Sequence, residues 1–503
     1  MTLNTPPVAG PGAVRTAPEP TVRRTQAFIG GAFVDAQSGR TFPTFAPATG
    51  RALAEVADGG AEDVDRAAAA GRAAFDSGLW ASPSVRRDAL MRLADLVEIH
   101  ASELAVLDAI DAGKPITDCE TQDIPEVAHL FRWYAEAIDK VFGKVSPSVD
   151  GALGVISREP VGVVGIVVPW NYPAVMLSFK AAPALAAGNC VVAKPAEQAP
   201  LSALRLAELA AEAGVPSGVF NVVPGNGPTT GRAVGEHPLI DAVAFTGSTE
   251  VGRAFLRYSA DSNLKNVVLE LGGKSPQIVM SDMKDDLEAI AADLAGAAFG
   301  NAGQNCTAGS RVLVANSLRE ELTERLAHAA ARIRVGDPLD YATQMGPLIE
   351  PASLARVSRY VGEAAGSGAT VRVGGQAVLE ETGGYFYPPT VVADVTPDLP
   401  IARDEIFGPV VSVLGFDAEE QAVAIANDSS YGLAATLWTH DVDVAIRVSR
   451  RVRAGTVAVN GYSEGDITTP FGGHRMSGFG GRDSGVEALE QYTELKTTWF
   501  TLR

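Results

Sequence analysis

The sequence predicts an α/β protein with two doubly wound parallel-sheet domains and a small β oligomerisation element. Three observations support this fold class. Short apolar runs rich in β-branched residues alternate with helical stretches, which is the pattern of a parallel sheet covered on both faces. The 503 residues suffice for roughly two to four domains with cores of their own. Two extended segments lie outside the two series of alternating strands and helices.

The first segment, residues 1–25, is rich in Pro, Ala and Thr and has no apolar periodicity. This composition predicts a disordered tail. Arg15, Arg23 and Arg24 leave a transit peptide as the alternative, which Glu19 disfavours because such peptides are poor in acids.

Helices and then alternating strands follow the tail. From residue 60 to about 142 the pattern is helical, with Leu90, Leu93, Leu96 and Val97 on one face. Near-continuous apolar runs then predict buried parallel strands, with a helix over 201–214 among them. The strand runs are 163–168, 190–194, 221–223, 242–245 and 267–271.

Beyond the tail, the chain divides into three parts. The first α/β domain takes residues 26–143 and 161–271. The second takes residues 272–472, through which another strand–helix series runs. Residues 144–160 and 473–503 are extended, and because exposed strand edges pair readily, we expect them to form the oligomerisation element.

The charge balance excludes two classes of partner. Lys and Arg total 41 and Asp and Glu total 60, which gives a formal net charge of −19. Binding nucleic acid requires clustered cations, and so does binding an anionic membrane surface. Residues 161–179 are uncharged, but Pro169 and Pro173 break a helix there, so we expect no membrane span.

The three cysteines are too few for a disulfide scaffold and predict a reducing, cytoplasmic location. The six histidines show no metal-ligand spacing, so no metal site is expected. Cys119 lies between two acids and Cys190 begins an apolar strand. Cys306 lies in FGNAGQNCTAGSR, where backbone N–H groups approach the thiol and are expected to lower its pKa. Cys306 is therefore the candidate nucleophile.

Two further side chains could serve chemistry at strand ends. Glu270, in LELGGKSP, is either a general base with a pKa raised by burial or a structural acid that bonds the Gly-Gly amides. Asn171, in PWNYP, is either a fixed oxyanion donor or a turn residue that bonds its own backbone.

A glycine turn and an ionic pair suggest nucleotide binding. Residues 242–252, AVAFTGSTEVG, place Gly247 and Ser248 between a strand and a helix, which favours an anion such as a diphosphate. The turn lacks the dinucleotide and P-loop fingerprints. Lys194 and Glu197 in VVAKPAEQ suit ribose or phosphate, or are plain surface charges.

Together these motifs resemble the NAD(P)-dependent aldehyde dehydrogenase superfamily from about residue 28 to residue 500. The resemblance rests on PWN, KPAEQ, FTGSTEVG, LELGGKSP, GQNCTAGSR, EIFGPV, YGLAA and PFGG, in the family's order and spacing. It implies an NAD-binding first domain, a catalytic second domain, and a homodimer or homotetramer.

The resemblance also implies catalytic roles. Cys306 attacks the aldehyde to form a thiohemiacetal, whose oxyanion is held by the Asn171 side chain and the Cys306 N–H. Hydride loss gives a thioester, and Glu270 activates the water that hydrolyses it. Lys180 matches a lysine near the proton path.

The implied cofactor is NAD, with NADP as the alternative, and Glu197 favours NAD because it repels a 2′-phosphate. Lys194 and Glu197 hold the adenosine ribose, and Ser248 meets the diphosphate. Glu405 and Phe407 position the nicotinamide riboside. The remaining implied cofactor residues are Trp170, Gly231, Phe245 and Gly247.

The implied aldehyde tunnel is lined by residues after PWN, beside the cysteine, and before PFGG. They are Tyr172, Met176, Phe179, Asn305, Thr307 and the loop 460–471, with Glu464, Asp466 and Phe471. Two carboxylates at a tunnel mouth favour a cationic tail, and the sequence looks most like ω-aminoaldehyde enzymes. The alternatives are a broad, betaine or aromatic aldehyde dehydrogenase, and a non-catalytic protein on the same fold.

The sequence departs from the family pattern at two places. His474-Arg475 follows PFGG where the family has an aromatic residue and Lys, and an extra glycine lies in GFGGRD, residues 478–483. Neither departure is expected to touch the chemistry.

Overall fold

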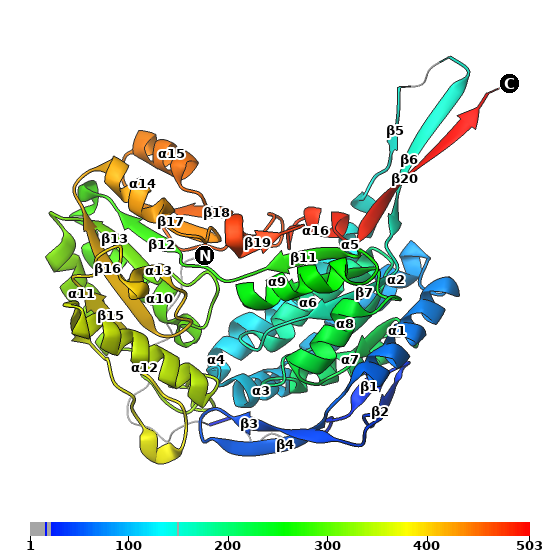
Figure 1. Ribbon diagram of the computed structural model, residues 1–503, viewed down its shortest axis with the longest axis horizontal. Coiled ribbons are helices and arrows are strands. Elements are labelled where there is room, and N and C mark those ends of the chain that lie inside the picture. Colours follow the sequence, from blue (N-terminus) through cyan, green and yellow to red (C-terminus); the bar gives the residue numbers. More distant parts are fainter. Residues whose placement is uncertain (1–15, 18–21, 148–149, 503) are drawn as a thin grey trace.

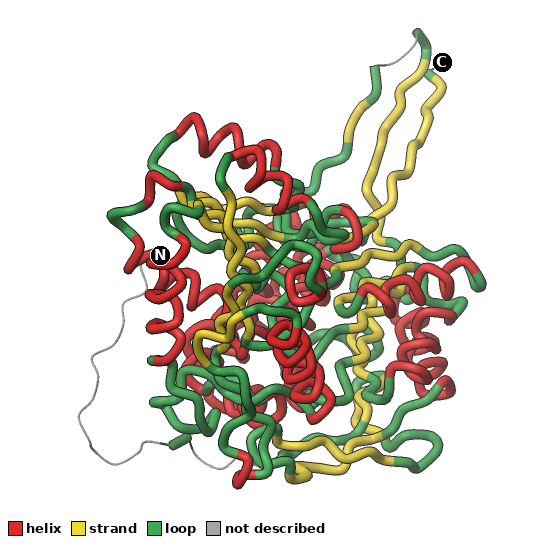
Figure 2. The backbone as a smooth tube through the Cα atoms, turned by 60° about the vertical axis from the view of Figure 1, so that its left-hand side comes forward, coloured by secondary structure: helices red, strands yellow, loops and turns green. Residues whose placement is uncertain are grey.

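The computed structural model describes residues 16–17, 22–147 and 150–502. Two α/β lobes lie side by side, and a narrow three-stranded arm extends from one of them (Figures 1 and 2). The α/β class and the two sheet domains are thus confirmed.

The first lobe is built on an eight-stranded sheet in the order β19-β11-β10-β7-β8-β9-β1-β2. The five predicted apolar runs form its parallel centre, with ends that differ by about a residue from the prediction. Its strands are β1 (Ala27–Ile29), β2 (Ala32–Val34), β7 (Val163–Val167), β8 (Cys190–Lys194), β9 (Phe220–Val222), β10 (Ala242–Thr246), β11 (Asn266–Glu270) and β19 (Gly478–Phe479).

Helices cover this sheet, and Leu90, Leu93 and Val97 are fully buried as their spacing predicts. The helical pattern continues through His100, but the structure has two helices there, since His100 ends α2 and begins α3. The helices are α1 (Ala61–Asp76), α2 (Pro83–Ile99), α3 (Ala101–Ala112), α4 (Ile116–Asp118), α5 (Ile124–Ala137), α6 (Pro173–Ala186), α7 (Leu201–Glu212), α8 (Arg232–Glu236) and α9 (Thr249–Ala260).

The second lobe has a seven-stranded sheet in the order β14-β15-β16-β13-β12-β17-β18, parallel except at β14. Its strands are β12 (Pro276–Val279), β13 (Arg311–Ala315), β14 (Thr370–Val373), β15 (Thr390–Ala393), β16 (Val410–Phe416), β17 (Ala434–Trp438) and β18 (Thr456–Val459). Its helices are α10 (Leu287–Phe299), α11 (Arg319–Ala331), α12 (Pro351–Gly366), α13 (Pro400–Arg403), α14 (Glu419–Asn427) and α15 (Val442–Arg451).

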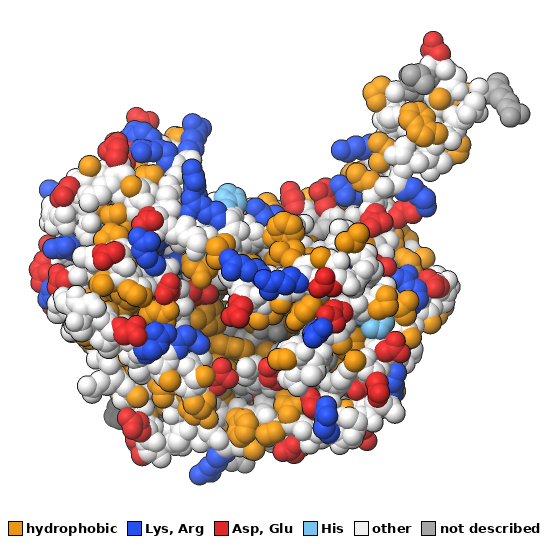
Figure 3. Space-filling model, viewed as in Figure 1, with side chains coloured by type: hydrophobic (Ala, Val, Ile, Leu, Met, Phe, Trp, Pro, Cys, Tyr) orange, Lys and Arg blue, Asp and Glu red, His pale blue; other side chains and the backbone are white. Residues whose placement is uncertain are grey.

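The arm consists of β5 (Lys144–Val145), β6 (Ala152–Pro160) and β20 (Thr493–Thr501), with β6 paired to both others. Figure 3 shows hydrophobic side chains spread over the arm, and Leu495, Trp499 and Phe500 are exposed. Residues 473–503 are not one element, since β19 joins β11 of the large sheet and α16 (Glu487–Glu490) packs on α6. A separate hairpin pairs β3 (Thr41–Ala46) with β4 (Arg51–Ala57).

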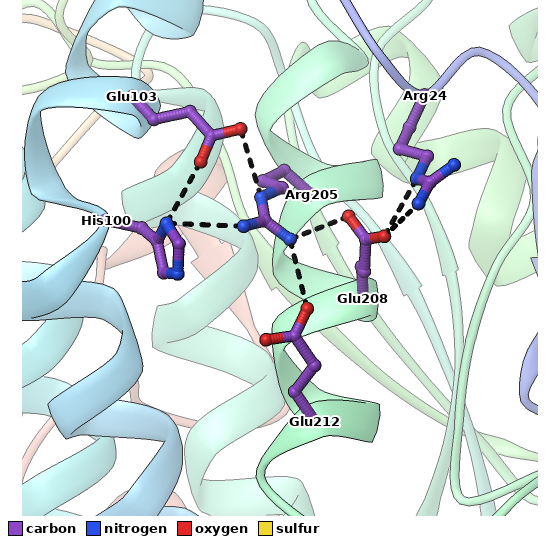
Figure 4. Close-up of polar contacts among 6 residues, drawn as sticks. All are labelled: Arg24, His100, Glu103, Arg205, Glu208 and Glu212. Atoms are coloured by element: carbon purple, nitrogen blue, oxygen red, sulfur yellow. Dashed lines mark hydrogen bonds and ion pairs between the residues drawn. The ribbon is translucent and has the colours of Figure 1, made fainter.

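The expected disordered tail falls mostly outside the described residues. Where residues 1–25 are described, the chain is packed: the Ala17 N–H donates to the Leu339 carbonyl at 2.9 Å. Arg24 binds Glu208 of α7, within an ion-pair network that includes Arg205 (Figure 4). The tail prediction is corrected at these positions.

Within the described ranges, no helix is long and apolar enough to cross a membrane. The same residues hold no group of three or more His, Cys, Asp or Glu side chains arranged for a metal ion.

Candidate active site

The candidate residues gather where the parallel strands of the first lobe end. Glu270 is the last residue of β11 and lies opposite Thr246, the last residue of β10. The Gly247 N–H donates to the Glu270 carbonyl at 3.1 Å, which holds the glycine turn against this strand end. Carboxyl ends of parallel strands are where open α/β sheets bind ligands.

Glu270 has a buried carboxylate. The side chain is 3% exposed, and neither carboxylate oxygen has a hydrogen-bond partner among the described residues. Burial, with the charge of Asp483, raises its pKa well above the ordinary range, while Lys180, Arg482 and the nearby Gly473 backbone oppose the shift. The Gly273 N–H donates to Glu405 instead, at 3.0 Å. The structure therefore disfavours the alternative of an acid that bonds the Gly-Gly amides.

Lys180, on α6, forms a buried ion pair that the sequence did not reveal. Its Nζ lies 2.9 Å from Oδ2 of Asp483, and both side chains are almost inaccessible. The Phe471 backbone holds Asp483 through two hydrogen bonds, of 2.6 and 2.8 Å. Asp483 and Arg482 end the GFGGRD stretch and both act on the Glu270 pKa, so this stretch reaches the candidate site through these two side chains.

Cys306 follows α10 and the 3₁₀ turn η5 (Gly300–Gly303). Its pKa is raised well above the ordinary thiol value, chiefly by burial and then by Glu464, Glu405 and Glu270. A backbone hydrogen bond acts to lower this pKa, as expected, but burial and then the three carboxylates outweigh it, so the expected net lowering is wrong. The thiol needs a base or a rise in pH to become the nucleophilic thiolate.

The other two cysteines are structural. Cys119 and Cys190 are fully buried, and burial raises the pKa of both, for Cys190 to about 12. Burial disfavours the thiolate at both positions, with further help from nearby acids at Cys119, so neither cysteine is a candidate nucleophile.

Asn171 lies just after β7 and is 4% exposed. Its Nδ2 donates to the Gln304 carbonyl at 2.9 Å, across the boundary between the lobes. Asn171 therefore does not bond its own turn, which was the alternative. One Nδ2 hydrogen is left for another acceptor.

The ionic pair predicted for the cofactor is formed. Lys194 ends β8, and its Nζ lies 2.7 Å from Oε2 of Glu197. Burial acts to raise the pKa of Glu197, but Lys194 overrides it and holds that pKa below its usual value. Glu197 is thus an anion fixed in place.

The glycine turn ends at the N-terminus of α9, where Ser248 accepts a hydrogen bond from the Val251 N–H at 3.3 Å. Its hydroxyl hydrogen remains free to donate. Phe245 is buried beneath the turn, and a Cβ at Gly247 would press on its ring, so Phe245 supports the turn from below. A Cβ at Gly231 would meet nothing within 4 Å, so there is open space beside this buried glycine.

Three further cofactor candidates come together between the lobes. The rings of Trp170 and Phe407 meet edge to face with centroids 5.5 Å apart. Phe407 has a left-handed backbone, with φ +55°, and such strain clusters at ligand sites. Burial raises the pKa of Glu405 to about 7, although the hydrogen bond from the Gly273 N–H acts to lower it.

The residues at the start of α6 that are expected to line the aldehyde tunnel lie on one face of the helix. Tyr172, Met176 and Phe179 are half-buried at helical spacing, whereas their neighbours are buried. Lys114 lies over the Tyr172 ring, with Nζ 3.4 Å from its centroid.

A hydrogen-bond network connects the loop 460–471 to both neighbours of Cys306. Glu464 Oε1 accepts from Asn305 at 2.8 Å, from Thr307, and from the Tyr462 hydroxyl at 2.6 Å. The sequence indicates this loop but gives no separate signal for Tyr462. Asp466 is not part of the network: its Oδ1 accepts from the backbone and hydroxyl of Thr468 in an exposed turn.

The comparison with known proteins decides the family. Residues 33–498 match the aldehyde dehydrogenase family model. This chain belongs to the aldehyde dehydrogenase family. It is 50% identical over 476 residues to aminoacetaldehyde dehydrogenase of Pseudomonas aeruginosa, with 94% of this chain and 95% of that protein covered.

Two more proteins similar to this aldehyde dehydrogenase are themselves aldehyde dehydrogenases. It is 48% identical to the NADP/NAD-dependent aldehyde dehydrogenase PuuC of Escherichia coli, with 94% and 95% of the two chains covered. The crystal structure of γ-glutamyl-γ-aminobutyraldehyde dehydrogenase from Burkholderia cenocepacia matches with a TM-score of 0.93 and 51% identity, over 95% and 97% of the chains. The resemblance found in the sequence is confirmed, and the chain is an enzyme.

Proposed function

We propose that this aldehyde dehydrogenase oxidises an ω-aminoaldehyde to its carboxylate with NAD and water. The observation that carries the substrate class is the carboxylate of Glu464, bound to both neighbours of Cys306. The similarity to the aminoacetaldehyde and γ-glutamyl-γ-aminobutyraldehyde enzymes supports the same class.

The residues at the strand ends divide the chemistry between them. The Cys306 thiolate adds to the aldehyde carbon, and the second Nδ2 hydrogen of Asn171 and the Cys306 N–H stabilise the oxyanion that forms. After hydride loss the Cys306 thioester is hydrolysed by water, from which Glu270 takes a proton. A carboxylate with a raised pKa suits this role near neutral pH.

The residues that would hold NAD fit a dinucleotide. Lys194 and Glu197 suit the ribose hydroxyls, and Ser248 at the start of α9 suits the diphosphate. Glu405, Phe407 and Trp170 lie where the nicotinamide riboside is expected. NAD, when bound, accepts the hydride that leaves the thiohemiacetal carbon.

Glu464 supplies the substrate preference. All three of its donors bind Oε1, which leaves Oε2 without a hydrogen bond among the described residues. An ammonium group three or four bonds from the aldehyde would find this anion fixed in place, so little ordering entropy opposes binding.

The test compares γ-aminobutyraldehyde with pentanal, its neutral analogue of the same length, by NADH formation. We expect Glu464→Gln to lower kcat/KM about tenfold for the cationic aldehyde only, the effect of roughly 1.4 kcal/mol. Asp466→Asn is the matched control, since Asp466 caps an exposed turn, and should change neither. Equal effects of Glu464→Gln on both aldehydes would favour the broad-specificity alternative.

Two further predictions belong to this proposal. The arm, with its exposed apolar side chains, supports a homodimer or homotetramer. The low cysteine content, with all three thiols free, supports a cytoplasmic enzyme.

A further inference from the structure

Asn171 belongs to a closed set of buried amides that the proposed chemistry does not explain. Asn301 Nδ2 donates to the Asn171 carbonyl at 2.8 Å and to the Gln304 carbonyl at 3.3 Å. The same Gln304 carbonyl accepts from Asn171 Nδ2 at 2.9 Å. All three side chains are at most 6% exposed.

Gln304 is anchored in turn by the second lobe. Its Nε2 donates to the Asn301 carbonyl at 3.2 Å, and its Oε1 accepts from the Ile349 N–H at 2.9 Å. Asn171 follows β7 of the first lobe, whereas Asn301 and Gln304 follow α10 of the second. The amide set therefore fixes the first lobe's amide to the turn that carries Cys306.

The backbone at this turn is strained. Asn301 has φ +49° and ψ +37°, and Ala302 has φ +55° and ψ +32°, both left-handed. Such conformations cost on the order of 1–3 kcal/mol each and persist only where the surroundings impose them. Asn tolerates this region better than most residues, and here the conformation places its amide between two carbonyl groups.

We propose that Asn301 and Gln304 are positioning residues that fix the direction of the Asn171 amide. An asparagine amide can turn by 180° with little change of shape. In the turned state Oδ1 of Asn171 would face the Gln304 carbonyl, and two acceptors repel. The Gln304 carbonyl, held by Asn301, therefore selects the state in which Nδ2 presents its second hydrogen to the oxyanion.

This inference rests on the proposed oxyanion role of Asn171, so its test begins there. Asn171→Ala should lower kcat by about 10²–10³, the effect of losing one oxyanion donor. Asn301→Ala and Asn301→Gly both remove the amide, and the glycine variant also adopts the left-handed backbone without strain. We expect each to lower kcat about ten- to hundredfold without changing NAD affinity, because misplacement by about 1 Å has effects of that size.

The matched control is Ala302→Gly, which relaxes the same backbone and leaves the amide contacts intact. It should leave kcat unchanged, and thermal unfolding of each variant checks that it folds. If Asn171→Ala keeps full activity, both the oxyanion role and this inference are wrong. If only Asn171→Ala loses activity, the inference alone is overturned.

The decisive readout is the double variant. A residue that acts through Asn171 has nothing to orient once that amide is gone, so Asn301→Ala should cause no further loss in the Asn171→Ala background. Multiplicative losses would show an independent structural effect and overturn the inference. Full non-additivity supports it.

Discussion

A carboxylate that binds ribose hydroxyls also repels a 2′-phosphate, and Glu197 is held as an anion by Lys194. We expect Glu197→Gln to raise kcat/KM for NADP several-fold, because the repulsion of the 2′-phosphate is lost. The same change should weaken the binding of NAD, because the ribose hydroxyls lose a charged acceptor. Steady-state kinetics with both cofactors measure this change. An unaltered NADP/NAD ratio would place Glu197 away from the ribose.

The candidate site residues that the sequence indicates are those that stand in recognisable local motifs. Cys306, Glu270 and Asn171 each stand in a short motif at a strand end or turn. Asp483 was missed because its partner Lys180 is 303 positions away, and nothing near either residue signals the pair. The direction of the Cys306 pKa shift was wrong because it depends on tertiary structure, first through burial of the thiol and then through Glu464 and Glu405 from distant loops.

At the scale of elements, the strands were predicted closely because buried parallel strands are continuous apolar runs. The break at His100 was not predicted, because the apolar period continues from α2 into α3. Helix α3 also carries buried acids: burial raises the pKa of Asp108 to about 7 and that of Asp111 to about 8.

These acids predict a pH dependence of stability. Between about pH 4 and pH 7 the folded protein keeps a proton on Asp108 that the unfolded chain has lost, so stability falls as pH rises, by up to about 1.4 kcal/mol per unit. Asp108→Asn removes the contribution of Asp108 to this pH dependence. The free energy of unfolding of the variant, relative to that of the parent, should therefore increase from pH 5 to pH 8. Urea unfolding at both pH values measures it, with exposed Asp88→Asn as the control. A constant difference would contradict the raised pKa.

At the scale of the molecule, the division of residues 473–503 between sheet and arm was not visible in the sequence. β19 is two residues long, and its pairing with β11 depends on tertiary contacts rather than on its own composition. The arm itself was predicted as extended, because Thr and aromatic residues favour strands.

The arm should control assembly. Trp499 is 59% exposed on β20, and Trp499→Glu places a charge on an apolar face. We expect a smaller assembly by light scattering, while Thr498→Glu, on the opposite face of β20, serves as the control for the added charge. An unchanged mass for Trp499→Glu would place the subunit contact elsewhere.

The central claim is that oxidation passes through a thioester on Cys306 which Glu270 helps to hydrolyse. Its most direct test is intact mass and peptide mapping of Glu270→Gln after mixing with NAD and γ-aminobutyraldehyde. The account predicts one equivalent of NADH in a burst and an acyl adduct that accumulates on the Cys306 peptide, absent in Cys306→Ser. Continued turnover by Cys306→Ser, or an adduct on another residue, would contradict it.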